Sequence, residues 1–416
     1  MFEAQRGEFC DAPVSSGSSR LNCRLITVFR TGVLTVAVFG TVLQRVSVWE
    51  NQAMAQPPAP AAATNDSESD AANLYHLRRA PERVMGVFRG DCKKCHPSEV
   101  AAWMKTTHYQ SSDLRLLSFK GNTQKYADSL KISRDDLLGN SLCANCHGTK
   151  SVVNGQVKVV SGVSCESCHG ASGGEGGWLS RHQSYHNNQP LPRNQETPEH
   201  REQRIADSEA AGMIRSHNLF DQAQACFRCH VVGNADLIAA GHKMSSAAFE
   251  YVSWSDGEVR HNFLLDRTQN AKAPSLWQET TNGSTENRRR LKFVVGTLAQ
   301  LEAMLRARAE MTSPIVIPQI GGSIAAANGK LAQINAMAPT EEVGAVAGII
   351  GPMLATLFAP LPDDEARYSK AADDVAQYAR AFAAKHDGSK LPALDAMINL
   401  TPPRFSQQFR QKYLRE

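Results

Sequence analysis

Four short segments of the chain share one spacing: two cysteines separated by two residues, with a histidine directly after the second cysteine. This pattern is the attachment signal for a c-type haem. Two thiols one helical turn apart can form thioethers to both vinyl groups of one porphyrin, and the next imidazole can then bind the iron from one side. The four motifs run from Cys92 to His96, from Cys143 to His147, from Cys165 to His169 and from Cys226 to His230.

Cysteine pairs with this spacing also occur in zinc ribbons, where two pairs make a tetrahedral thiolate site. A zinc site does not account for the histidines. The chain has 13 histidines in 416 residues, so chance does not place one behind all four pairs. The sequence therefore predicts four covalently attached haem c groups, with thioether bonds from Cys92, Cys95, Cys143, Cys146, Cys165, Cys168, Cys226 and Cys229 and proximal iron ligands His96, His147, His169 and His230.

The other two cysteines, Cys10 and Cys23, precede a segment typical of a secretory signal. Arginines lead into an apolar run over residues 31–43, and Ala53-Met54-Ala55 has the small-x-small form of a cleavage site. The run is too short to cross a bilayer easily. We predict that residues 1–55 are a signal peptide cleaved after Ala55, with an uncleaved signal anchor, and hence membrane attachment, as the alternative. Either way, the folded part is exported to the periplasm.

Composition divides the rest of the chain into three parts. Residues 56–73 are rich in proline, alanine and acids and are expected to form a disordered tether. Residues 74–285 hold all four motifs between short helices and irregular stretches, as expected where porphyrins supply much of the core. Residues 286–416 lack cysteine and have helical periodicity. We expect a mainly α protein: a multihaem cytochrome c domain with little regular strand, followed by a haem-free C-terminal helical bundle with its own core.

Prolines and glycines modify two of the expected bundle helices. Pro318, with two glycines after it, predicts that the second helix begins only at about Ser323, and Pro352 predicts a kink in the third. His386 follows the last helix and is expected to be a solvated residue rather than an iron ligand. The expected helices cover residues 291–311, 315–337, 341–358 and 363–385.

Nine histidines remain as candidates for the distal side of the irons. A second imidazole gives a six-coordinate, low-spin iron suited to electron transfer, whereas an open position can bind small molecules. His108 is the strongest candidate, because it falls on the inward stripe of an expected helix with Val100 and Met104. Beyond the third motif, His182 is favoured over His186. His242 and His261 both follow the fourth motif and are both retained. His76 and His200 are expected at the surface, while His217, Met104, Met213 and Met244 are the other possible ligands.

The arrangement of the motifs resembles the tetrahaem cytochrome c-554 family of nitrifying bacteria. His108 lies 12 residues beyond His96 and behind a tryptophan-containing helix, the second and third motifs are close together, and glycines follow their histidines at Gly148 and Gly170. The resemblance covers residues of about 90–265. It implies a mostly helical fold around stacked haem pairs, electron transfer in the periplasm, and three bis-histidine haems beside one with an open iron. By position, it implies His108, His182 and one of His242 or His261 as distal ligands.

The leading functional hypothesis is an electron carrier between periplasmic donor and acceptor proteins. The alternative is a haem enzyme that acts on a small nitrogen or oxygen compound at a five-coordinate iron. The chain has neither the Cys-x-x-Cys-Lys motif of multihaem nitrite reductases nor the eight motifs of octahaem hydroxylamine-oxidising enzymes. Basic residues are scattered and eight haem propionates would outweigh the formal charge of +4, so we expect no nucleic-acid partner. The bundle is a candidate surface for oligomerisation.

Overall fold

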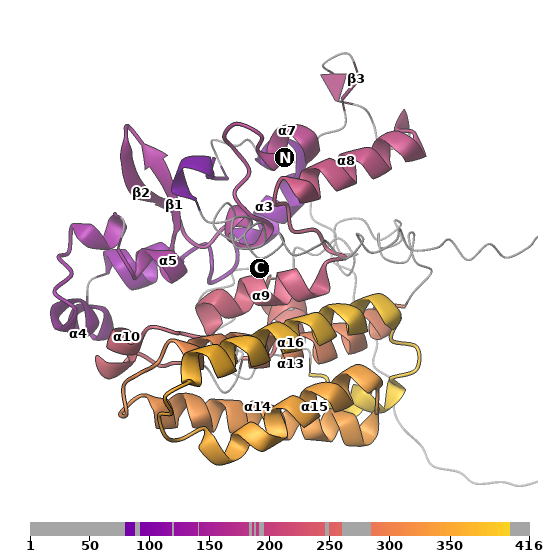
Figure 1. The fold of residues 1–416 in the computed structure, drawn as a ribbon. Helices are drawn as coiled ribbons and strands as arrows, with labels where there is room; N and C mark the ends of the chain where they lie inside the picture. The colour runs from indigo at the N-terminus through magenta and orange to yellow at the C-terminus, as the bar shows by residue number, and fades with distance from the viewer. Residues whose placement is uncertain are drawn as a thin grey trace, which may run out of the picture. The chain divides into compact units, whose positions relative to one another are not determined.

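The structure is a computed structural model, and its fold is mainly helical with two short hairpins, as the sequence predicts (Figure 1). No helix among the described residues is long and apolar enough to cross a membrane. The predicted signal peptide and tether lie outside the described residues, which are 80–87, 92–118, 120–139, 141–182, 185–186, 189–190, 195–245, 249–259 and 284–399.

All four cysteine–histidine motifs fall on helical turns, which is the conformation that their spacing requires. We number the motifs 1 to 4 in chain order. They lie on α2 (Cys92–Cys95), α5 (Ala144–His147), α6 (Cys165–His169) and α9 (Leu219–His230). The other elements of this half are η1 (Pro81–Arg83), α3 (Pro97–Trp103), η2 (Asp113–Leu117), α4 (Asn122–Ser129), η3 (Asp136–Leu138), α7 (Trp178–His182), α8 (Pro198–Ala210), α10 (Ala235–Ala239), α11 (Tyr251–Trp254) and η5 (Ser255–Val259).

A β-hairpin joins motif 2 to motif 3. Strands β1 (Thr149–Val153) and β2 (Gln156–Ser161) pair antiparallel across an Asn-Gly turn, and both turn residues have positive φ. At the base of the hairpin, the Thr149 hydroxyl contacts the Ser164 hydroxyl at 2.9 Å, just before α6 begins. The hairpin therefore fixes the two motifs relative to each other. A second, shorter hairpin pairs β3 (Tyr185–His186) with β4 (Gln189–Pro190).

The C-terminal half contains the four predicted bundle helices, coloured orange to yellow in Figure 1. The second helix begins at Ile317 rather than at about Ser323, because Pro318 lies in its first turn, where a missing N–H costs no hydrogen bond. Pro352 lies in the last turn of the third helix, which continues as a short 3₁₀ turn instead of kinking midway. The elements are α13 (Thr285–Ala309), α14 (Ile317–Met337), α15 (Glu341–Met353), η6 (Leu354–Thr356), α16 (Asp364–Lys385) and η7 (Pro392–Met397).

One hydrophobic core joins the bundle to the helix that carries motif 4. Helix α9 contacts both α13 and α16. Its residues Phe220 and Phe227 are buried in the same cluster as Val294 and Leu298 of α13. Most of this cluster lies in the bundle, and it also includes the apolar face of α9. The boundary near residue 285 marks the beginning of α13, but the packing continues from α13 onto α9.

Candidate haem-binding sites

Two of the motif histidines, His169 and His230, are held in place by contacts on a ring nitrogen or on the ring face. His169 Nδ1 donates a hydrogen bond to the carbonyl of Ile214 at 2.8 Å, which leaves Nε2 to face a metal. The ring of His230 stacks on Phe249, with 4.0 Å between ring centres. Such contacts fix the orientation of an imidazole before a metal binds, as is typical of iron and zinc ligands.

Three motif histidines each face a second histidine from a distant part of the chain. Each second histidine is one of the distal candidates named from the sequence. The pairs, with the distance between ring centres, are His96 with His182 at 5.9 Å, His230 with His108 at 6.2 Å, and His147 with His242 at 6.4 Å.

These ring separations fit an iron held between two imidazoles. Two metal–nitrogen bonds of about 2.0 Å, with each ring centre about 1.1 Å behind its nitrogen, place the ring centres about 6.2 Å apart. Burial also keeps two of these rings, those of His182 and His230, in the neutral form that binds metal. Burial, reinforced by the charge of Arg215, lowers the pKa of His182 to about 3. Burial lowers the pKa of His230 to about 3 as well, with His108 adding to the effect.

His108 reaches its position from a turn and not from a helix. Helix α3 begins at Pro97 and ends at Trp103, and Met104 is 40% exposed. The predicted inward stripe of Val100, Met104 and His108 is therefore wrong, because the helix ends one turn too early. His108 nevertheless lies inside the protein, and burial lowers its pKa.

A nearby serine and a glycine from far along the chain hold the turn around His108. The Ser111 hydroxyl lies 2.7 Å from the His108 carbonyl and also contacts the carbonyl of His147 in motif 2. Gly162 lies against the same backbone: a Cβ at this position would be 2.2 Å from the His108 carbonyl oxygen. The segment before motif 3 therefore fits against His108 only because residue 162 has no side chain.

A charged clamp holds the end of the helix that carries His182. Arg204 Nη1 on α8 donates to the His182 carbonyl at 3.0 Å. The same guanidinium makes two hydrogen bonds to Glu196, at 2.6 and 2.7 Å. These bonds lower the pKa of the Glu196 carboxyl to about 2. Arg204 is thus positioned by a carboxylate while it satisfies a free carbonyl at the end of α7.

His242 lies in the turn after α10 and is supported by α4. The Tyr126 hydroxyl donates to the Gly241 carbonyl at 2.9 Å, and its ring centre is 5.4 Å from that of His242. His242 Nδ1 donates to the carbonyl of Lys243 at 2.8 Å. As in His169, this bond leaves Nε2 as the nitrogen available to a metal.

Glu166 is one of the two residues between the cysteines of motif 3. Its structural role was not predicted from the sequence. Its buried carboxylate accepts hydrogen bonds from the backbone N–H groups of Met85, Gly86 and Ser172, and from the Ser172 hydroxyl. It therefore joins the beginning of the described chain to motif 3. Its acidic side chain inside a haem motif is the one sequence feature that could have indicated this role. No sequence feature near Tyr126 or Arg204 indicates that they support distal ligands.

The other candidate ligands lie elsewhere. His386 is only 20% exposed, because it packs on Phe382 and pairs with Glu342 at 3.0 Å, so it is less solvated than predicted. His200 and His217 are exposed and pair with Glu196 and Glu209. His186 lies in β3, Met104 is exposed, Met213 and Met244 are buried, and His76 and His261 lie outside the described residues.

Contacts join each motif to at least one other motif. Cys92 and Cys165 pack on the same small apolar cluster, and a hydrogen bond between their thiols raises the pKa of Cys165. Helix α6 of motif 3 contacts α9 of motif 4. The Cys229 thiol of motif 4 lies 3.9 Å from the carbonyl of Asn145 in motif 2. Motif 2 also adjoins motif 3 through the base of the hairpin, where Thr149 contacts Ser164.

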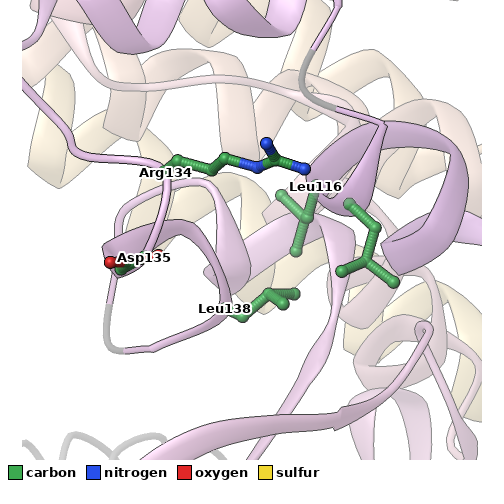
Figure 2. A pocket seen from close by; sticks show the side chains of 5 residues that line it. Leu116, Arg134, Asp135 and Leu138 are labelled. Atoms are coloured by element: carbon green, nitrogen blue, oxygen red, sulfur yellow. The ribbon is translucent and has the colours of Figure 1, made fainter.

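A small cavity of about 180 Å³ lies near motif 2, between η2 and η3. Figure 2 shows Leu116 and Leu138 projecting toward each other, with Arg134 passing above them. None of its lining residues belongs to a motif or to a ring pair. The cavity is therefore separate from the candidate haem sites.

The comparisons with known proteins agree with this part of the structure. Residues 91–170 match the family model for cytochrome c554 and c-prime. The match covers motifs 1 to 3 and the hairpin between them, and it ends before motif 4 and the bundle. No curated protein and no solved structure gave a significant match. Over residues 91–170, the chain is therefore similar to the cytochrome c554 family of c-type cytochromes, which bind haem c covalently.

Proposed function

We propose that the protein is an exported tetrahaem cytochrome that transfers electrons between periplasmic donor and acceptor proteins. The observation that carries this proposal is the set of three imidazole pairs at 5.9 to 6.4 Å. Covalently bound haem c supplies reversible one-electron chemistry. An iron held between two imidazoles keeps both ligands in either redox state, so it suits electron transfer better than catalysis.

In this proposal, each pair completes one iron. His182 is the distal ligand of motif 1, His108 that of motif 4 and His242 that of motif 2. Burial lowers the pKa of His182 and His108 and so favours the neutral form that binds a metal, and the Nδ1 hydrogen bond of His242 orients its ring. For motif 3, His261 is the remaining candidate from the sequence, and an open iron is the alternative.

The contacts between motifs support a route for electrons through the molecule. Motifs 1 and 3 adjoin at Cys92 and Cys165, motifs 3 and 4 at helices α6 and α9, and motifs 4 and 2 at Cys229 and Asn145. Each attachment site therefore has a neighbour. A carrier needs such neighbours to pass an electron from one haem to the next.

Low-temperature electron spin resonance of the oxidised protein tests this proposal. We expect at least three low-spin irons per chain, because three motif histidines each face a second imidazole. One high-spin iron would assign an open position to motif 3. Two or more high-spin irons would contradict the carrier and would favour the enzyme that acts on a small nitrogen or oxygen compound.

A further inference from the structure

We propose that the surface around motif 2 is the docking site for an acidic redox protein. The proposal rests on the electron-transfer function proposed above and identifies the chemistry of one partner. Its basis is a group of lysines from three separate elements that surround the motif 2 site. We call Lys125, Lys150 and Lys243 the lysine collar.

The collar is defined by short distances to motif 2 and to its candidate distal ligand. Lys150 Nζ on β1 donates to the side-chain oxygen of Asn145, inside the motif, at 2.5 Å. Lys243 follows His242 directly, and its carbonyl accepts the Nδ1 hydrogen bond of that ring. Lys125 Nζ on α4 is 3.3 Å from the position that a Cβ on Gly241 would occupy. The ammonium groups of Lys125 and Lys150 therefore lie beside the same site, and Lys243 belongs to the turn that carries its candidate distal ligand.

The charge around this site differs from that of the chain as a whole. Residues 120–160, which form α4, η3, motif 2 and the hairpin, contain six basic and three acidic side chains, whereas the whole chain is nearly balanced at 45 to 41. Lys125 and Lys243 are exposed, so their ammonium groups can meet a partner without losing internal contacts. Asp128, one turn beyond Lys125 on α4, is the acid on the same helix. The local excess of positive charge favours an acidic partner surface.

The exposure of the motif 2 site makes this surface a place where electrons enter or leave. Asn145, inside motif 2, is exposed, and so are Gly241 and Lys243 on either side of His242. The hydrogen bond that orients His242 lies at the surface. A partner attracted to the collar would therefore be brought next to the motif 2 iron. Long-range attraction of this kind raises association rates by roughly 10- to 1000-fold at low salt.

Stopped-flow reduction of the oxidised holoprotein tests the proposal, with reduced plant-type ferredoxin as a strongly acidic protein donor. The methyl viologen radical is the small, cationic donor that reports whether the haems still accept electrons. The variant Lys125→Glu/Lys243→Glu reverses the charge at two of the three collar positions. It leaves the hydrogen bond from Lys150 to Asn145 intact. The matched control is Lys370→Glu/Lys390→Glu, which changes the net charge equally at exposed positions on and after α16.

We expect the ferredoxin rate to fall as salt rises and to fall about tenfold or more at low salt in the collar variant. The control should stay within about twofold of the wild type, and Lys125→Gln/Lys243→Gln should lie between them. Methyl viologen should reduce all variants at similar rates. A salt-independent ferredoxin rate, or equal losses in the collar variant and the control, would overturn the docking site.

Two further outcomes separate this proposal from others. A holoprotein that methyl viologen does not reduce would refute the electron-transfer function itself. Collar-dependent binding to vesicles of phosphatidylcholine and phosphatidylglycerol, without any effect of the collar on the ferredoxin rate, would show that the surface binds anionic lipid and would overturn the protein partner.

Discussion

Single residues far apart in the chain hold the candidate distal ligands in place. Ser111 and Gly162 fit around the backbone of His108, Arg204 binds the carbonyl of His182, and Tyr126 binds the turn before His242. Each contact acts on backbone next to the histidine and not on its ring. The supporting residues can therefore be changed without removing a ligand.

Replacing His108 with alanine tests the assignment of the motif 4 iron. We expect one low-spin iron per chain to become high-spin and its reduction potential to rise, because an imidazole donor to the oxidised iron is lost. Spin resonance and redox titration measure both changes. The matched control is His200→Ala, which removes an exposed imidazole paired with Glu196 and should alter neither spectrum nor potential. An unchanged spin count in the His108 variant would show that this residue packs in the interior and does not bind an iron.

Substituting Gly162 with alanine tests how the His108 turn is held. The new Cβ would lie 2.2 Å from the His108 carbonyl oxygen and 2.3 Å from that of Tyr109, and both are backbone atoms that cannot rotate away. We expect a loss of about 1–3 kcal/mol in the free energy of unfolding and the same spin change as in the His108 variant. Gly329→Ala is the control, because nothing lies within 4 Å of its Cβ position. If the two variants have the same free energy of unfolding and the same spin count, the close backbone approach at residue 162 does not hold the His108 turn.

The Tyr126→Phe variant tests support of the motif 2 ligand. It keeps the ring beside His242 but removes the hydrogen bond to Gly241, so we expect about 1 kcal/mol less stability. Because the turn that carries His242 loosens, one midpoint in a redox titration should shift while the others stay in place. Tyr378→Phe, in the bundle, should shift none. Shifts of every midpoint would instead indicate a general loss of structure.

Among the elements, α9 has two roles, because it carries motif 4 and also joins the bundle core. Phe227 lies inside the motif and packs edge-on against Phe249, whose ring stacks on His230. Phe227 and Phe249 belong to the same core cluster as residues of α13. The bundle therefore supports a haem site directly, and it is more than a module joined by a linker.

Replacing Phe220 with alanine tests this shared core. Phe220 on α9 is 3% exposed and lies in the cluster with α13, so its truncation should cost about 3–5 kcal/mol. Phe358→Ala is the matched control, because this phenylalanine is 53% exposed and should cost little. Denaturant unfolding followed by both haem absorbance and helical circular dichroism measures the effect. Separate transitions for haem and helix would contradict a common core.

The ion pair between Glu196 and Arg204 of α8 predicts how the free energy of unfolding depends on pH. Hydrogen bonds from Arg204 hold the pKa of Glu196 at about 2, below its usual value of 4.5. The ionised Glu196 carboxylate therefore contributes up to about 3 kcal/mol to the free energy of unfolding. This contribution is complete above pH 4.5 and is lost as the pH falls through about 2. Glu196→Gln should be less stable than the wild type at pH 6, and the difference should vanish near pH 2. A difference that is the same at both values would exclude the ionised carboxylate as its cause.

In the whole molecule, local patterns were predictable and distant contacts were not. The motif helices follow from a spacing of three residues, and helical periodicity located the bundle helices to within a few residues. No periodicity links His182 to motif 1 or His108 to motif 4, because those pairs depend on how short helices and turns pack. The shared core was missed because the apolar face of α9 lies among the residues of a haem motif.

Coulometric titration under anaerobic conditions tests whether the protein is a tetrahaem electron carrier. We expect each chain to take up four electrons and to return four on reoxidation, because four motifs each hold one haem and each motif adjoins another. A chain that takes up fewer than four electrons, or that does not return all of them, would contradict a tetrahaem electron carrier.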